Sequence, residues 1–202
     1  MLVYASFVAD RKTAILDAAI AVIARNGVRG LRVEDVAETA GVAVSLLYYH
    51  FGTRNGLVRA ALDHANERAA SQCARVEESC GYARVRRMLL SEFDDLPHVR
   101  ETSVVWGEVL ASAVFDSELR DQLRAANDSW VALVARRIGD GQSDGSVRSD
   151  CDRWACAECL TSLVDGLSAR WLAGLLDREH ACELLDRAIS RTLRPDAVAQ
   201  PA

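Results

Sequence analysis

The chain has 202 residues and a formal net charge of −5; half of its residues are hydrophobic and 26% are charged. This length is enough to bury a substantial hydrophobic core. No apolar run reaches the roughly 18 residues that a membrane span needs. The apolar start Met1–Val8 lacks the basic residues and cleavage pattern of a signal peptide. We therefore expect a cytoplasmic globular protein that does not enter a membrane.

The acidic net charge is unevenly distributed along the chain. Residues 1–55 contain six basic and five acidic residues, whereas the remainder contains 18 basic and 24 acidic residues. A nucleic-acid-binding surface is usually basic, so the whole-chain charge alone argues against one. The division of charge weakens that objection, because the acidic excess lies outside the first 55 residues.

Helical periodicity dominates the hydrophobic pattern, and only three prolines occur, of which Pro97 alone lies well inside the chain. The pattern predicts an all-α fold of about nine helices. The expected helices span residues 10–25, 33–39, 44–50, 54–79, 82–95, 99–113, 117–138, 151–176 and 180–193. Residues 139–146 read as a loop, because glycine and short polar residues are concentrated there. Asn26-Gly27, Gly41 and Gly52 are predicted helix ends. Thr53 is a predicted helix N-cap, and Ser149 or Asp150 is the predicted N-cap of the helix over residues 151–176.

The most informative segment is LRVEDVAETAGVAVSLLYYHFGTR, from Leu31 to Arg54. Two short helices joined at Gly41 form a helix-turn-helix pattern, in which Val42 and Leu47 would fill the junction. The second helix of such a motif lies in the DNA major groove. Periodicity alone does not separate this interpretation from a generic helical corner, which also uses glycine.

The residue identities in and around this segment are more specific evidence than its hydrophobic periodicity. The residues that provide this specific evidence are Ile15, Leu16, Ala18, Ala19, Gly27, Val36, Ala37, Ala40, Gly41, Val42, Leu47, Tyr48, Tyr49, His50, Phe51, Arg54 and Leu57. With them, the stretch from about Ala14 to Leu62 resembles the TetR family of bacterial transcriptional regulators. The segment from Trp106 to Gly174 carries Trp106-x-Glu108 and Leu163-Val164-Asp165-Gly166-Leu167. It resembles the subgroup of choline-responsive betaine regulators.

The resemblance implies a DNA-binding domain over residues 1–53 and a ligand-binding and dimerisation domain over residues 54–202. The implied DNA-binding residues are Val44, Ser45, Leu46, Tyr48, Tyr49, His50 and Arg54. Arg32 is added to the candidates because, although it departs from the family pattern, it could point at a phosphate. Tyr48, His50 and Arg54 would contact phosphates, and the residues that open the second helix would read base edges. Arg54 lies in the first turn of a helix, where its charge opposes the helix dipole, so a purely structural role is unattractive for it. Arg32 and Ala43 stand where the family has hydroxyl residues that cap helices, so two caps are lost.

The C-terminal residues must supply dimerisation and ligand sensing under this hypothesis. The predicted helices 151–176 and 180–193 carry wide apolar stripes, and the first also carries small residues on its faces, which favours a four-helix interface in a homodimer. The candidate ligand-binding residues are Phe93, Trp106, Glu108, Phe115, Trp130 and Trp171. An acid beside tryptophans can hold a cation, and Trp106 with Glu108 is the candidate pair. Aromatic residues at helical spacing are also ordinary core residues.

We interpret the chain as a ligand-responsive transcriptional repressor that binds a palindromic DNA operator as a homodimer and is released by a small hydrophobic or cationic effector. No metal or cofactor is expected, because the four histidines show no metal-ligand spacing and no catalytic signature occurs. One alternative is a helical small-molecule-binding protein or enzyme with a vestigial helix-turn-helix. Another is a thiol-based redox sensor that uses Cys156 and Cys159. We expect those two cysteines to be small buried core residues.

Overall fold

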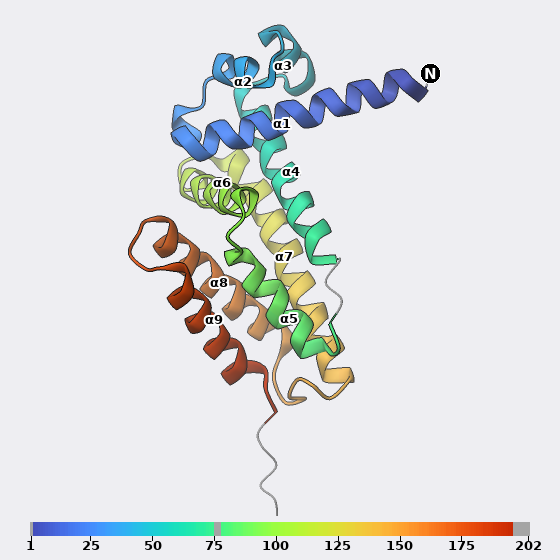
Figure 1. Ribbon diagram of the computed structural model, residues 1–202, viewed down its shortest axis with the longest axis vertical. Helices are drawn as coiled ribbons and strands as arrows, with labels where there is room; N and C mark the ends of the chain where they lie inside the picture. Colours follow the sequence, from blue (N-terminus) through green and yellow to red (C-terminus); the bar gives the residue numbers. More distant parts are fainter. Residues whose placement is uncertain (1, 75–77, 196–202) are drawn as a thin grey trace, which may run out of the picture. The chain divides into compact units, whose positions relative to one another are not determined.

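The computed structural model describes residues 2–74 and 78–195, with side chains for residues 11–69, 71 and 78–195. Within these residues the chain is helical, as predicted (Figure 1). The α-helices are α1 (Leu2–Gly30), α2 (Val33–Ala40), α3 (Val44–Phe51), α4 (Arg54–Ala74), α5 (Gly81–Leu90), α6 (Pro97–Ala113), α7 (Ser117–Ser143), α8 (Arg153–Leu172) and α9 (Arg178–Leu193). A short 3-10 helix, η1 (Ser91–Phe93), follows α5. None of the described helices is long and apolar enough to cross a membrane.

The predicted loop at residues 139–146 is wrong over its first half, because α7 continues to Ser143. Gly141 serves close packing inside α7, whereas Gly145 has a left-handed backbone (φ 78°) in the turn that follows the helix. A Cβ atom at Gly81 would lie 2.3 Å from the Cα of Gly141, and one at Gly141 would lie 2.5 Å from a methyl group of Val147. Glycine is therefore required where α5 begins against α7, at a cost in intrinsic helix propensity.

The ends of the last two helices also differ from the prediction. The N-cap of α8 is Asp152, whose carboxylate accepts from the backbone N–H groups of Trp154 (2.8 Å) and Ala155 (3.4 Å). We had expected Ser149 or Asp150 in this role. Asp177 caps α9 in the same way through the N–H of His180. An aspartate at either position satisfies N–H groups that have no partner inside the helix.

The chain divides into two compact units, which we call unit 1 and unit 2. Unit 1 consists of residues 1–71 and 97–124, and unit 2 of residues 72–96 and 125–202. Unit 1 therefore extends past the predicted domain boundary at residues 53 and 54, since it contains most of α4, the whole of α6 and the start of α7. The boundary itself stays a prediction.

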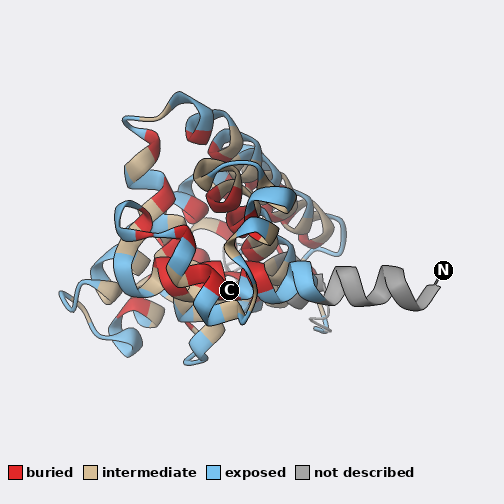
Figure 2. Ribbon diagram, turned by 90° about the horizontal axis from the view of Figure 1, so that it is seen from above, coloured by how far each residue is buried: buried red, intermediate tan, exposed pale blue. Residues whose placement is uncertain are grey.

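Each unit has its own hydrophobic core, formed by the inward sides of its helices (Figure 2). The buried residues of unit 1 are all Ala, Val, Ile or Leu, from α1 to α4, α6 and α7. In unit 2 the buried set includes Phe93 and Met88, and Tyr82, Trp130 and Trp171 pack against it. Burial of these apolar side chains is the main contribution to the stability of both units.

Candidate nucleic-acid interface and sensor

Helices α2 and α3 of unit 1 form the predicted helix-turn-helix. Gly41 has a left-handed backbone (φ 65°) that L side chains rarely adopt, and it ends α2. The N–H of the next residue, Val42, donates to the carbonyl of Ala37 at 3.0 Å and closes the turn. Leu47 is only 1% exposed and packs in the core of unit 1, with Val42 half-buried beside that core. Both residues occupy the junction that the sequence predicted for them.

The outer side of α3 displays hydrogen-bonding and aromatic side chains. Tyr49 is 82% exposed, Tyr48 is 48% exposed and Ser45 is exposed as well. The half-buried His50 packs edge-on against Tyr49, with 5.2 Å between the ring centroids. Six of the eight predicted DNA-binding residues therefore lie on this one short helix, and Ser45 stands in its first turn.

Of the predicted DNA-binding residues, Val44, Leu46 and Arg32 lie close to this exposed surface. Val44 and Leu46 are half-buried and pack against the core of unit 1, so only part of each side chain is available to a partner. Arg32 is exposed at the N-cap position of α2. As the sequence predicted, neither Arg32 nor Ala43 provides a side-chain acceptor at the N-cap, so the first-turn N–H groups of α2 and α3 receive no side-chain cap from these residues.

Arg54 has a structural role that we had considered unattractive from its position. Its Nε donates to the carbonyl of Leu31 at 2.9 Å, and its Nη2 donates to the carbonyl of Val28. The guanidinium thus supplies donors to two carbonyls near the end of α1. Sequence reasoning missed this because residues 23 and 26 positions away reach Arg54 only through the tertiary fold. Contact of Arg54 with phosphate stays a prediction.

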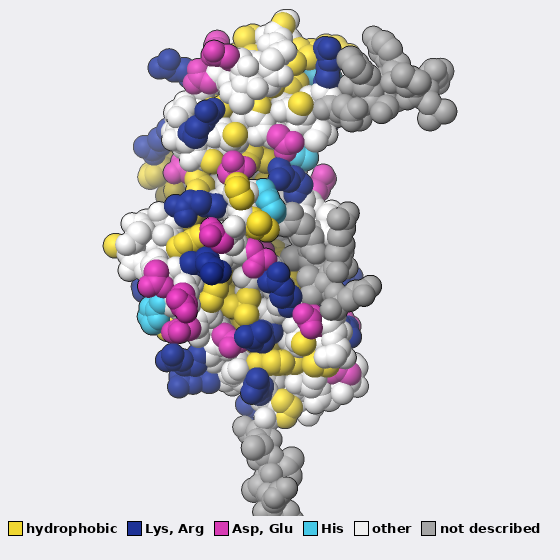
Figure 3. Space-filling view, in the orientation of Figure 1, with side chains coloured by type: hydrophobic (Ala, Val, Ile, Leu, Met, Phe, Trp, Pro, Cys, Tyr) yellow, Lys and Arg dark blue, Asp and Glu magenta, His cyan; other side chains and the backbone are white. Residues whose placement is uncertain are grey.

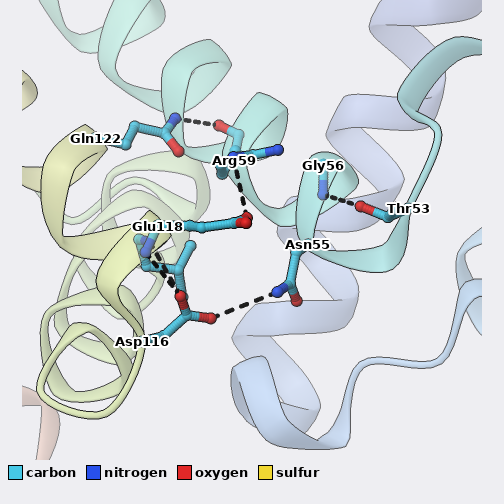
Figure 4. A network of polar contacts seen from close by, with 8 residues as sticks. Thr53, Asn55, Gly56, Arg59, Asp116, Glu118 and Gln122 are labelled. Carbon is cyan, nitrogen blue, oxygen red and sulfur yellow. Dashed lines mark hydrogen bonds and ion pairs between the residues drawn. The ribbon is translucent and has the colours of Figure 1, made fainter.

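A network of polar contacts joins the start of α4 to the start of α7 within unit 1 (Figure 4). Thr53 caps α4 through the N–H of Gly56 at 3.0 Å, as predicted. Asn55 donates to Asp116 at 3.4 Å, and Arg59 pairs with Glu118 at 3.3 Å. The first two turns of α4 are therefore held to Asp116 and Glu118 at the start of α7.

Gln122 extends the same network along α7. Its Nε2 donates to the carbonyl of Arg59 and to the carboxylate of Asp63, both at 2.7 Å. These contacts fix one face of α4 to α7 by hydrogen bonds whose partners are 59 to 63 positions apart. No local sequence pattern predicts such pairs.

The six candidate ligand-binding residues divide between the two units. Trp106, Glu108 and Phe115 belong to unit 1. Trp106 packs against the core, and its indole N–H is buried without a hydrogen-bond partner among the described residues. Phe115 is 79% exposed, and its ring lies 5.8 Å from the guanidinium of Arg29. The carboxylate of Glu108 accepts from the backbone N–H of Val28 at 2.9 Å. None of these contacts joins Glu108 to Trp106. A ligand-binding role for the two residues stays a prediction.

Phe93, Trp130 and Trp171 belong to unit 2. Phe93 is buried on η1, and its ring centroid lies 5.8 Å from that of Trp171 on α8 in a tilted arrangement. Trp130 and Trp171 are half-buried against the same core. These three aromatic residues therefore contribute to one hydrophobic cluster, which is compatible with either a core or a ligand-lining role.

Glu92 of unit 2 has a pKa that is strongly changed by its surroundings. Burial of its carboxyl group, followed by the negative charges of Asp165 and Asp94, raises the pKa of Glu92 to about 7. Its carboxylate accepts no hydrogen bond from the described residues, whereas Asp94 forms an ion pair with Arg87 at 2.9 Å. An ionisable group with a strongly raised pKa is a candidate for a functional role.

The two cysteines of the C-x-x-C sequence differ from one another. Burial and a hydrogen bond with Cys151 raise the pKa of Cys156 to about 11, which keeps this thiol protonated and slow to react. Cys159 is exposed on α8, so the prediction that both cysteines are buried core residues is wrong for Cys159. Cys159 shares the outer side of α8 with the exposed Ala155 and Ser162, at i−4 and i+3 spacing.

That outer face of α8 is a stripe at helical spacing. Its exposed members are Ala155, Cys159, Ser162, Gly166, Ala169 and Ala173. Basic and acidic side chains are interspersed on the face of the molecule that Figure 3 shows, without one continuous basic patch. The small-residue stripe is the part of α8 that the predicted homodimer would use, and that interface stays a prediction.

Comparison with known proteins now identifies the family. Residues 15–61 match the model "Bacterial regulatory proteins, tetR family", and residues 81–194 match "BetI-type transcriptional repressor, C-terminal". The regulator BetI of Ectopseudomonas mendocina is 27% identical over 173 residues, which cover 84% of this chain and 84% of that protein. The regulator TtgR of Pseudomonas putida is 26% identical, with 81% and 80% coverage.

Solved structures agree with this assignment. A crystal structure described as a TetR-family transcriptional regulator from Rhodococcus sp. is 42% identical, with a TM-score of 0.86, and the match covers 92% of this chain and 99% of that one. A transcriptional regulator from Saccharomonospora viridis, solved in complex with choline, is 26% identical, with a TM-score of 0.77 and coverage of 93% and 99%. The family consists of DNA-binding regulators and not of enzymes. The chain belongs to the TetR family of transcriptional regulators and carries a BetI-type C-terminal domain.

Proposed function

We propose that this regulator is a repressor that binds a palindromic operator as a homodimer and is released by a small hydrophobic or cationic effector. The observation that carries the proposal is the construction of α3. Leu47 anchors the helix in the core, while Ser45, Tyr48 and Tyr49 remain exposed on its outer side. A helix held in this way can enter the major groove without losing its own packing.

The exposed residues suggest which side chains contact base edges and which contact phosphates. Ser45 and Tyr49 are placed to contact base edges, and the accessible parts of Val44 and Leu46 suit the methyl group of thymine. Tyr48, His50 and Arg32 suit phosphate oxygens, and so do the first-turn N–H groups of α2 and α3 that lack a side-chain cap. A charge-poor surface of this kind predicts modest dependence of affinity on salt.

The homodimer follows from α8 and α9. Two copies can bring their exposed α8 stripes close together, because the residues of the stripe are small. At Gly166, a Cβ atom built on the backbone would have no neighbour within 4 Å in the single chain, so this position is open to a partner helix. Closed two-fold pairing of this kind places two recognition helices on one palindrome.

The effector class follows from the composition of unit 2. Phe93, Trp130 and Trp171 supply aromatic surface, and Glu92 supplies a carboxylate without a hydrogen-bond partner among the described residues. Aromatic faces and a carboxylate together favour an organic cation. The choline complex of the related regulator from Saccharomonospora viridis supports the same class.

The test begins with selection of DNA from a random pool by the purified protein, followed by fluorescence anisotropy on the selected sequence. We expect a palindrome bound by two chains. Tyr49→Ala and Ser45→Ala should each raise the operator Kd about tenfold or more, as loss of a base contact does. Ser129→Ala, at an exposed position of α7, is the matched control. Failure to select any palindrome at low salt would contradict the proposal.

The effector part is tested on the same complex. Choline should release the DNA, and its uncharged analogue 3,3-dimethylbutan-1-ol should do so far more weakly if charge is recognised. Equal release by both compounds would instead favour a hydrophobic effector. Release by hydrogen peroxide that disappears in Cys159→Ser would favour the thiol-sensor alternative.

A further inference from the structure

The connection between α1 and α2, residues 27–31, is held from two different helices of unit 1. Gly27 interrupts the helical backbone with a φ of 71° and a ψ of 167°, although helical residues continue to Gly30. Beyond this break, the orientation of α2 relative to α1 depends on contacts made by residues 27–31 as well as on the apolar core. Two charged side chains from distant parts of the chain hydrogen-bond the backbone of this connection.

Helix α6 supplies the first of these side chains. Glu108 accepts from the N–H of Val28 at 2.9 Å, across a sequence separation of 80. The approach is close, because a Cβ atom at Gly27 would lie 2.7 Å from the same carboxylate oxygen. Just beyond the end of α6, Phe115 also contacts the guanidinium of Arg29. The C-terminal half of α6 and the turn that follows it therefore contact two neighbouring residues of the connection, Val28 and Arg29.

Helix α4 supplies the second side chain at its first residue. Arg54 donates to the carbonyls of Leu31 and Val28. Val28 is consequently bonded on both sides, through its N–H to an anion from α6 and through its carbonyl to a cation from α4. Charged partners make stronger hydrogen bonds than neutral ones, and neighbouring bonds of this kind reinforce one another.

We propose that Glu108 is a positioning residue that couples α6 to the DNA-binding helices through Val28, and that Arg54 completes this coupling from α4. The proposal rests on the function proposed above, since it concerns how α2 and α3 are oriented for DNA. Glu108 thereby has a part in operator affinity although it lies outside the helix-turn-helix. The coupling is reciprocal, so operator binding must in turn stabilise the bond between Val28 and Glu108.

Operator affinity provides the first test. Glu108→Ala should raise the operator Kd about tenfold, in line with the loss of a charged hydrogen bond. Glu108→Gln keeps an oxygen that can accept from Val28 and should stay within about threefold of the wild type. The control is Glu101→Ala on the same helix, which should leave the Kd unchanged. Equal Kd values for Glu108→Ala and the wild type would overturn the proposal.

A double-mutant cycle tests whether the two side chains act on one element. Arg54→Ala alone should weaken operator binding by tenfold or more. If both residues act through Val28, the double variant should weaken binding by clearly less than the product of the two single effects. Strictly multiplicative effects would mean independent roles and would overturn the coupling. Arg54→Lys replaces Arg54→Ala if the latter fails to fold.

Hydrogen exchange of the free protein makes the test independent of any operator. Glu108→Ala should accelerate exchange at Val28 and through the first turn of α2, while exchange in unit 2 remains as in the wild type. Unchanged exchange at these amides would overturn the proposal even if DNA binding is confirmed. Accelerated exchange without any operator binding by the wild type would instead contradict the proposed function, because the contact would then exist without the DNA-binding role it is proposed to serve.

Discussion

Units 1 and 2 have similar all-helical construction but different interiors. The buried residues of unit 1 are aliphatic, and its polar side chains are used to join helices, as Glu108, Arg54 and Gln122 do. Unit 2 has Phe93 in its core, two tryptophans against it and Glu92 without a hydrogen bond from the described residues. Unit 1 also contains buried side-chain atoms that have no hydrogen-bond partner among the described residues, namely Asn66 Nδ2, Trp106 Nε1 and Gln122 Oε1. The two interiors therefore differ in their aromatic content and in the charged and polar side chains that join helices, rather than in complete satisfaction of polar groups.

This difference agrees with the division of work proposed for the protein. A reader of DNA must hold its recognition helix in one orientation, and polar contacts that join neighbouring helices add to that rigidity. A sensor must instead retain polar and aromatic groups whose interactions are completed by something else. Three changes test whether the two interiors differ in this way.

Truncation of a core leucine should have the largest effect. Leu47→Ala should lower the free energy of unfolding by about 2–5 kcal/mol, because it leaves a cavity under the recognition helix. Hydrogen exchange should show the loss in unit 1 and spare unit 2. Leu185→Ala, which removes a fully buried side chain from α9, is the matched change and should give the opposite distribution. Equal losses in both units for either variant would show that the two cores unfold as one.

A pH dependence should distinguish unit 2 through Glu92. The pKa of Glu92 is about 7 in the folded protein and 4.5 in an ordinary environment, so the folded state keeps a proton that the unfolded chain has lost. The stability due to this proton is present below pH 4.5 and is lost as the pH rises through 7, by about 3 kcal/mol in total. Urea unfolding from pH 5 to pH 8 should therefore show a steeper decline for the wild type than for Glu92→Gln.

The control for that measurement is Glu158→Gln, which changes an exposed acid on α8 and should reproduce the wild-type pH profile. Identical profiles for the wild type and Glu92→Gln would contradict the raised pKa. They would also remove Glu92 from the proposed effector site.

The smallest effect is expected at a helix end. Asp152→Ala removes the side-chain acceptor for two N–H groups of α8 and should cost about 1 kcal/mol. Asp150→Ala, two residues earlier, removes an exposed pair with Arg148 and should cost less than half as much. Thermal unfolding compares the two variants directly. A larger loss for Asp150→Ala would restore the cap that the sequence had suggested.

The sequence by itself determined the helix-turn-helix and the all-helical class. Gly41 and the spacing of Val36, Ala37 and Leu47 are local signals, because helix periodicity and a left-handed glycine act within a few residues. The exposed outer side of α3 follows from the same periodicity. The resemblance to the TetR family was readable for the same reason, since its motif lies within one continuous segment.

Only the tertiary structure decided the contacts of Glu108, Arg54 and Gly141. From the sequence, Glu108 is a candidate ligand-binding acid and Arg54 a candidate phosphate contact, and both roles stay predictions. The tertiary structure adds that both side chains hydrogen-bond the backbone around Val28. Gly141 looked like part of a loop and instead lies in a helix where α5 approaches closely. Each outcome depends on which helices pack together, and a side chain that reaches across 80 positions has no counterpart in local periodicity.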